Sequence, residues 1–92
     1  MRLRIDVTQE DIDRGVRKSA RQCMVHRAID QATEGALGRF AVAPGGVFPE
    51  GGPGLAFPEQ VGELISAWDR GARINPFSFD LDMSPLLQEA GI

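Results

Sequence analysis

The chain has 92 residues and few of the residue types on which several kinds of site depend. It contains one cysteine, one histidine, one tryptophan and no tyrosine. A lone cysteine, Cys23, excludes a disulfide within the chain, which fits a reducing cytoplasm. A structural zinc site needs four ligands, and Cys23 and His26 are the only residues of these two types. We therefore predict neither a metal nor another cofactor.

Long apolar runs are also missing. No stretch approaches the ~20 apolar residues that a membrane-spanning helix needs. The first residues alternate charged with apolar side chains, which is unlike a signal peptide. The net charge is only −3, although residues 1–42 hold eight Arg/Lys against six Asp/Glu and residues 43–92 hold two against seven. We expect a soluble cytoplasmic protein that has no membrane partner and carries opposite charges in its two halves.

Two periodicities of apolar residues are present. Alternation typical of half-buried strands occurs near both ends, in Leu3, Ile5 and Val7 and again in Phe77, Phe79, Leu81 and Met83. Helical spacing covers residues 17–33 and a segment that begins near Pro58 and ends at Gly71. Thr8 is a suitable start for a short helical turn before Gly15, and residues 38–42 suit a short strand.

These patterns predict one α+β domain over residues 1–92. Its order is strand, helix, one or two short strands, helix, strand, with an antiparallel or mixed sheet and the helices packed on one face. A split βαβ sheet is one arrangement compatible with that order. The segment 43–56 has five glycines and three prolines, so we expect a flexible loop there, with a ragged hairpin as the alternative. Residues 84–92 suit a terminal turn that frays.

The strongest charged feature is a basic group near the start of the longer predicted helix. Its members are Arg14, Arg17, Lys18 and Arg21, with Arg27 further along. Spacings of three and four place several of them on one flank of a helix, where a phosphate backbone or an acidic protein patch could dock. A solvated helix face is the simpler interpretation. The negative net charge and the absence of tyrosine argue against nucleic acid.

Three other features suggest chemistry less strongly. Cys23 and His26 are three residues apart on the predicted helix, but a half-buried cysteine and a histidine at the surface edge explain them better than a nucleophilic pair. Asp80 and Asp82 share one face of the last strand, where charge also discourages edge-to-edge association. The glycines of 43–56 lack the lysine of a phosphate-binding loop. We predict no catalytic residue.

The chain has more large apolar side chains than so small a domain can readily bury. We expect some of them to form an exposed patch, the usual mark of a binding surface; the candidates are Phe48, Phe57, Leu86 and Leu87.

Three segments resemble small uncharacterised proteins of tailed phages and prophages: IDVTQEDIDRG (5–15), CMVHRAI (23–29) and WDRGARINPFSFDL (68–81). In those proteins a proline often follows the cysteine, sometimes with a second cysteine just before it, whereas this chain has Met24 and a single cysteine. The resemblance covers about half of the chain and implies no agreed activity. It implies a small accessory protein that binds host machinery, with anti-CRISPR inhibitors as one such class.

The function predicted from the sequence is therefore non-enzymatic binding to a host protein or ribonucleoprotein complex in the host cytoplasm. The concrete version is an anti-CRISPR inhibitor that blocks its target sterically or by charge. The binding residues would be Arg14, Arg17, Lys18, Arg21, Phe48, Asp80 and Asp82. The alternative is a small nucleic-acid-binding regulator that uses the basic helix flank, and a homodimer is left open in both cases.

Overall fold

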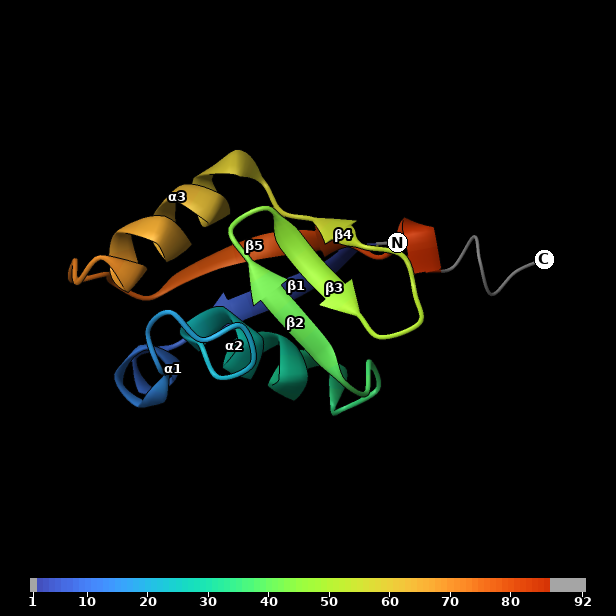
Figure 1. Cartoon of the computed structure of the whole chain (residues 1–92), viewed down its shortest axis with the longest axis horizontal. Coiled ribbons are helices and arrows are strands. Elements are labelled where there is room, and N and C mark those ends of the chain that lie inside the picture. The colour runs from blue at the N-terminus through green and yellow to red at the C-terminus, as the bar shows by residue number, and fades with distance from the viewer. Residues whose placement is uncertain (1, 87–92) are drawn as a thin grey trace.

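A computed structural model describes residues 2–86 of the chain and has a mixed α+β fold, as predicted. In chain order the elements are β1 (Arg2–Val7), α1 (Gln9–Arg14), α2 (Met24–Thr33), β2 (Phe40–Ala43), β3 (Gly46–Pro49), β4 (Leu55–Ala56), α3 (Glu59–Asp69) and β5 (Phe77–Asp82). Figure 1 shows them in sequence colours. Both strands expected near the ends are present, and so is the helix expected after Pro58.

The first and last strands pair with each other. β1 and β5 form an antiparallel two-stranded ribbon in which Ile5 lies opposite Phe79 and Leu3 opposite Leu81. Alternation sends these apolar side chains to one face, where Ile5 and Leu81 are fully buried. The ribbon closes one side of the hydrophobic core, as its alternating sequence predicts.

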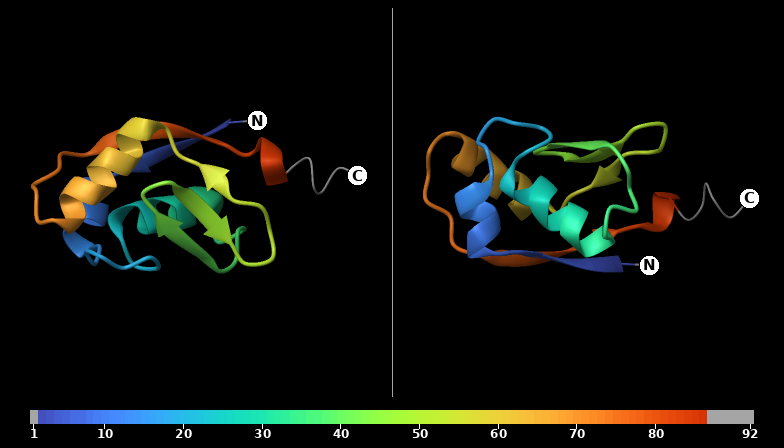
Figure 2. Two further views of the ribbon diagram at one scale, coloured as in Figure 1. Left: turned by 45° about the horizontal axis from the view of Figure 1, so that its top comes forward. Right: turned by 90° about the horizontal axis from the view of Figure 1, so that it is seen from below.

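The three remaining strands form a separate antiparallel sheet in the order β2–β3–β4. The split βαβ sheet, which was one arrangement compatible with the predicted order, is therefore not the one that forms. The right-hand view of Figure 2 places the β1–β5 ribbon and this second sheet on opposite sides, with α2 between them. The helices cover the inner face of the ribbon, and their apolar residues join those of both sheets in one core.

The prediction of a flexible loop over residues 43–56 is wrong for two parts of that segment. The structure contains a hairpin there, which was the alternative. β3 and β4 lie in it, and Val47 and Leu55 are at most 1% exposed. Burial of these side chains stabilises strands that the many glycines and prolines would otherwise disfavour. Gly46 is one glycine that the pairing requires, because a Cβ atom there would clash with the backbone of Leu55.

α1 begins as the sequence predicts, whereas α2 does not. The hydroxyl of Thr8 accepts a hydrogen bond from the Asp11 amide, and the Asp11 carboxylate accepts one from the Thr8 amide, which is a complete capping box. α2 starts at Met24 rather than near residue 17, because Cys23 caps it: its Sγ accepts from the amide of His26. Residues 16–22 form a loop instead, closed by a 2.7 Å hydrogen bond from the Val16 amide to the Gln22 carbonyl.

α3 carries its apolar residues as predicted. Val61, Ile65 and Trp68 are buried, and Pro58 occupies the N-cap position rather than the first turn. Gly71 ends the segment with a φ of +102°, a conformation that favours glycine. Among residues 2–86, no helix is long and apolar enough to cross a membrane.

The terminal turn expected over residues 84–92 lies only partly within the described chain. Residues 84–86 form a helical turn, and Leu86 packs against the core. The rest of that turn, including Leu87, lies outside the described residues.

Candidate functional site

The basic group does not lie on one helical flank. Arg14 is the last residue of α1, and the other three residues of the group belong to the loop that precedes α2. Lys18 has a φ of +61°, and its amide donates to the carboxylate of Asp69 at 2.8 Å. The predicted basic helix flank is therefore wrong, because the helix on which it depended begins only at Met24.

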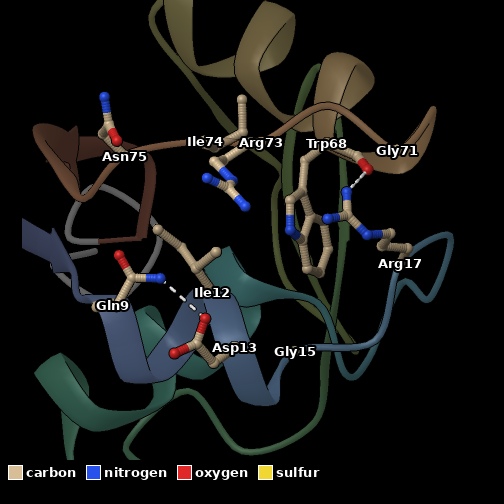
Figure 3. A pocket seen from close by; sticks show the side chains of 10 residues that line it. All are labelled: Gln9, Ile12, Asp13, Gly15, Arg17, Trp68, Gly71, Arg73, Ile74 and Asn75. Carbon is tan, nitrogen blue, oxygen red and sulfur yellow. Dashed lines mark hydrogen bonds between the residues drawn. The ribbon is translucent and has the colours of Figure 1, made fainter.

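Arg17 makes its contacts with other residues of the chain. Its guanidinium donates to the carbonyl oxygen of Trp68 (Figure 3). It also donates to the carbonyl oxygen of Ala72 and lies 4.9 Å from the centre of the indole ring. These carbonyls stand at the C-terminal end of α3, where a cation is favoured by the helix dipole. The role of Arg17 is to fasten the loop to that end of α3.

Arg14 and Arg21 do come together, beside Arg27, around a hollow of about 360 Å³. Arg14 and Arg27 each lie 3.8 Å from the Glu10 carboxylate, and Arg27 also lies 3.5 Å from that of Asp11. These acids offset part of the positive charge, which weakens the hollow as a phosphate site. Asp11 itself is 1% exposed and accepts a further hydrogen bond from Gln31, so this cluster mainly joins α1 to α2.

Cys23 and His26 make separate contacts. Cys23 is 3% exposed, and burial raises the pKa of its thiol. The His26 ring stacks on that of Phe40 with 3.9 Å between centroids, and its Nε2 lies 3.1 Å from the Phe40 carbonyl oxygen. The only hydrogen bond between the two residues joins the His26 amide, not its ring, to Sγ, a geometry that does not activate a nucleophile.

Asp80 and Asp82 lie on the outer face of the β1–β5 ribbon. Asp82 is opposite Arg2 and Asp80 is opposite Arg4 in the strand register. The Asp82 carboxylate accepts a 2.9 Å hydrogen bond from the Ser84 amide, and hydrogen bonds from Ser84 lower its pKa. The acidic face predicted for the last strand is thus interleaved with the arginines of the first.

Phe48 lies on the outer face of the three-stranded sheet and is 51% exposed. Ala41 lies opposite it in the strand register. Gly46, two residues before Phe48 on the same face, lies between Ala43 of β2 and Ala56 of β4. The three strands contain no charged or polar residue. A ring of this size, standing among small apolar neighbours, is an anchor typical of protein interfaces.

A cleft that the sequence did not suggest lies between α1 and the C-terminal end of α3. Its volume is about 690 Å³, within the range of small-molecule sites. The side chains in Figure 3 line it: Gln9, Ile12, Asp13, Arg17, Trp68, Arg73, Ile74 and Asn75, with Gly15 and Gly71 at its edges. Its residues come from two segments far apart in the sequence, 9–17 and 68–75, and no spacing pattern in the sequence unites them.

No protein-family model, no curated protein and no solved structure matches this chain. Within residues 2–86, no group of three or more His, Cys, Asp or Glu side chains is placed to hold a metal ion.

Proposed function

We propose that this protein acts by binding another protein through the outer face of its three-stranded sheet, with Phe48 as the central anchor. The observation that carries the proposal is the 51% exposure of Phe48 on a sheet face without charged or polar residues. Removing the exposed half of this ring from water on complex formation is worth about 0.8–1.5 kcal/mol.

The surroundings of Phe48 suit a docking surface. Its ring lies over Gly54, where an added Cβ atom would come within 3.1 Å of the ring carbons. Arg39 and Glu50 are exposed just outside β2 and β3, so charged side chains border the apolar centre. An apolar centre with a polar border is the usual composition of a protein interface.

The partner would engage the face of this sheet rather than the outer edge of β2. The amide of Val42 in that strand donates to the Ala20 carbonyl at 2.7 Å, so the loop before α2 already occupies part of the edge. Docking on the face needs no new strand pairing, and its strength depends on side-chain burial.

The concrete version of the proposal is an accessory protein of a phage or another mobile element that occupies a surface of a host complex. A CRISPR effector is the first such complex to test. Steric blocking fits the apolar face better than charge-based blocking does, since Arg2 and Arg4 stand opposite the ribbon aspartates.

The nucleic-acid alternative has weaker support. It required the basic residues on one helix, yet Arg17 binds the end of α3 and Lys18 lies beside Asp69. The remaining cluster of Arg14, Arg21 and Arg27 shares its hollow with Asp30, and the Glu10 carboxylate lies 3.8 Å from both Arg14 and Arg27.

Affinity capture with matched variants tests the proposal. Tagged wild type, Phe48→Asp and Val16→Asp are used as baits, since Val16 is the other large apolar residue within residues 2–86 that is strongly exposed, at 48%. We expect one host protein to be captured by wild type and Val16→Asp and lost with Phe48→Asp. In titrations of that purified protein, Phe48→Asp should raise Kd at least about 30-fold.

Thermal unfolding supplies the control for folding. Phe48 is half exposed, so Phe48→Asp should keep a cooperative transition close to that of wild type. Equal affinity of Phe48→Asp and wild type for the captured protein would contradict the proposal. The proposal would also be contradicted if a purified CRISPR effector or other host protein lost its binding with Val16→Asp and kept it with Phe48→Asp.

A further inference from the structure

The cleft between α1 and α3 contains a buried hydrogen-bond donor without a partner. Trp68 is 1% exposed, and its indole Nε1 makes no hydrogen bond with residues 2–86. In Figure 3 this nitrogen is on the edge of the ring that faces Arg73 and Ile12, across the cleft from Asp13. A buried donor left unpaired is unfavourable, so an acceptor that enters the cleft would gain a hydrogen bond that water does not supply.

Arg73 provides an uncommitted cation in the same cleft. It is exposed and takes part in no ion pair or hydrogen bond with the described part of the chain. Figure 3 shows its guanidinium directed into the space between Trp68 and Asn75. A guanidinium and an indole N–H that border one space can both donate to a single anionic group.

The other charged groups limit the charge of the ligand. Arg17 donates to the carbonyl oxygens at the end of α3, and the Asp13 carboxylate accepts a 2.8 Å hydrogen bond from Gln9. One arginine is therefore left to meet the ligand, while a carboxylate stands on the opposite wall. A singly charged planar group is favoured over phosphate, because phosphate would bring a second negative charge close to Asp13.

The walls indicate the rest of the ligand. Ile12 is nearly buried, Ile74 is half-buried, and both line the cleft beside the indole ring. We propose that this cleft binds a small monocarboxylate with a short apolar body, whose carboxylate accepts from Arg73 and from the indole N–H of Trp68. The proposal is independent of docking through Phe48, which does not line the cleft.

The single tryptophan makes the test direct, because the protein gives one indole N–H resonance in ¹H–¹⁵N NMR spectra. The full chain is titrated with butyrate, butan-1-ol and inorganic phosphate at constant ionic strength. We expect butyrate to shift the Trp68 indole and Gly71 amide signals saturably, with a Kd of about 1 mM. Butan-1-ol, which has the same carbon chain without the charge, should produce no saturable shift.

Two arginine variants give the matched comparison. Arg73→Gln removes the free cation of the cleft, and Arg70→Gln removes a neighbouring exposed arginine that does not line it. We expect Arg73→Gln to weaken butyrate binding about tenfold or more, and Arg70→Gln to leave it unchanged. Trp68→Phe keeps a ring but lacks the N–H, and it should also weaken binding, followed through the Gly71 amide.

Several results would overturn the proposal. These are equal shifts with butyrate and butan-1-ol, tighter binding of phosphate than of butyrate, unchanged butyrate affinity in Arg73→Gln, or no saturable shift with any of the three compounds. None of them bears on the docking of a protein at Phe48, so failure here and failure of the proposed function can be told apart.

Discussion

The ring of His26 is partly exposed and packs against the core. It stacks on Phe40, and its Nε2 is hydrogen-bonded to the carbonyl oxygen of that residue. Desolvation by this packing lowers the pKa of His26 below its ordinary value of 6.5. The unfolded chain therefore takes up a proton at a higher pH than the folded chain, and acidification through that range favours unfolding.

We predict that the free energy of unfolding falls as the pH is lowered from about 7.5 to 5.5, a range in which histidine is the side chain that ordinarily titrates. His26→Phe keeps an aromatic ring for Phe40 and has no titrating group, so its stability should change much less over this range. Urea unfolding of both proteins at several pH values measures the difference. An equally steep decline in the variant would show that another group is responsible.

Single residues also show where sequence reasoning reaches its limit. The exposure of Phe48 was anticipated, because apolar residues outnumber the sites that a small core offers. The role of Arg17 could not be anticipated, because it depends on the end of a helix 51 residues further along the chain. The sequence shows that Arg17 is basic, but it does not show that its partners are backbone carbonyl oxygens.

At the scale of elements, Gly62 determines how closely α3 approaches the second sheet. It is the fourth residue of the helix, at a position where a Cβ atom would come within 2.5 Å of the Pro44 carbonyl oxygen. Pro44 belongs to the turn between β2 and β3. The helix therefore contacts the backbone of that turn at a position where only glycine fits without a shift.

We predict that Gly62→Ala destabilises the protein, although alanine is the better helix former by about 1 kcal/mol. The overpacking against Pro44 should outweigh that gain and give a net loss of about 1–2 kcal/mol in the free energy of unfolding. The control is Glu63→Ala at the next, exposed helix position, which should be near neutral. Urea denaturation measures both, and a stabilised Gly62→Ala protein would contradict this packing.

Elements with strong periodicity were predictable. α3, β1 and β5 follow their apolar spacing closely, because each buries one regular face in the core. β3 and β4 were predicted only as the alternative to a flexible loop, because glycine and proline dominate their surroundings and tertiary burial of Val47 and Leu55 decides the outcome. The start of α2 was misplaced, since the cap at Cys23 outweighs the helical spacing before it.

For the whole molecule, the uneven charge along the sequence does not become an equally uneven surface. β1 is basic at its start and β5 is acidic, yet the two strands pair, so Arg2 and Arg4 stand opposite Asp82 and Asp80. The opposite charges of the two halves of the sequence are thus partly interleaved in space. This long-range pairing could not be deduced from composition, and it leaves the uncharged outer face of the second sheet as the most distinctive surface.

The most direct test of docking through that face is site-specific photo-cross-linking in host cells. A benzoyl-phenylalanine residue replaces Phe48 in one protein and the similarly exposed Val16 in another. We predict a discrete cross-linked product with one host protein from position 48 and none from position 16. Cross-links to that host protein from position 16 alone, or no discrete product from position 48, would contradict the account.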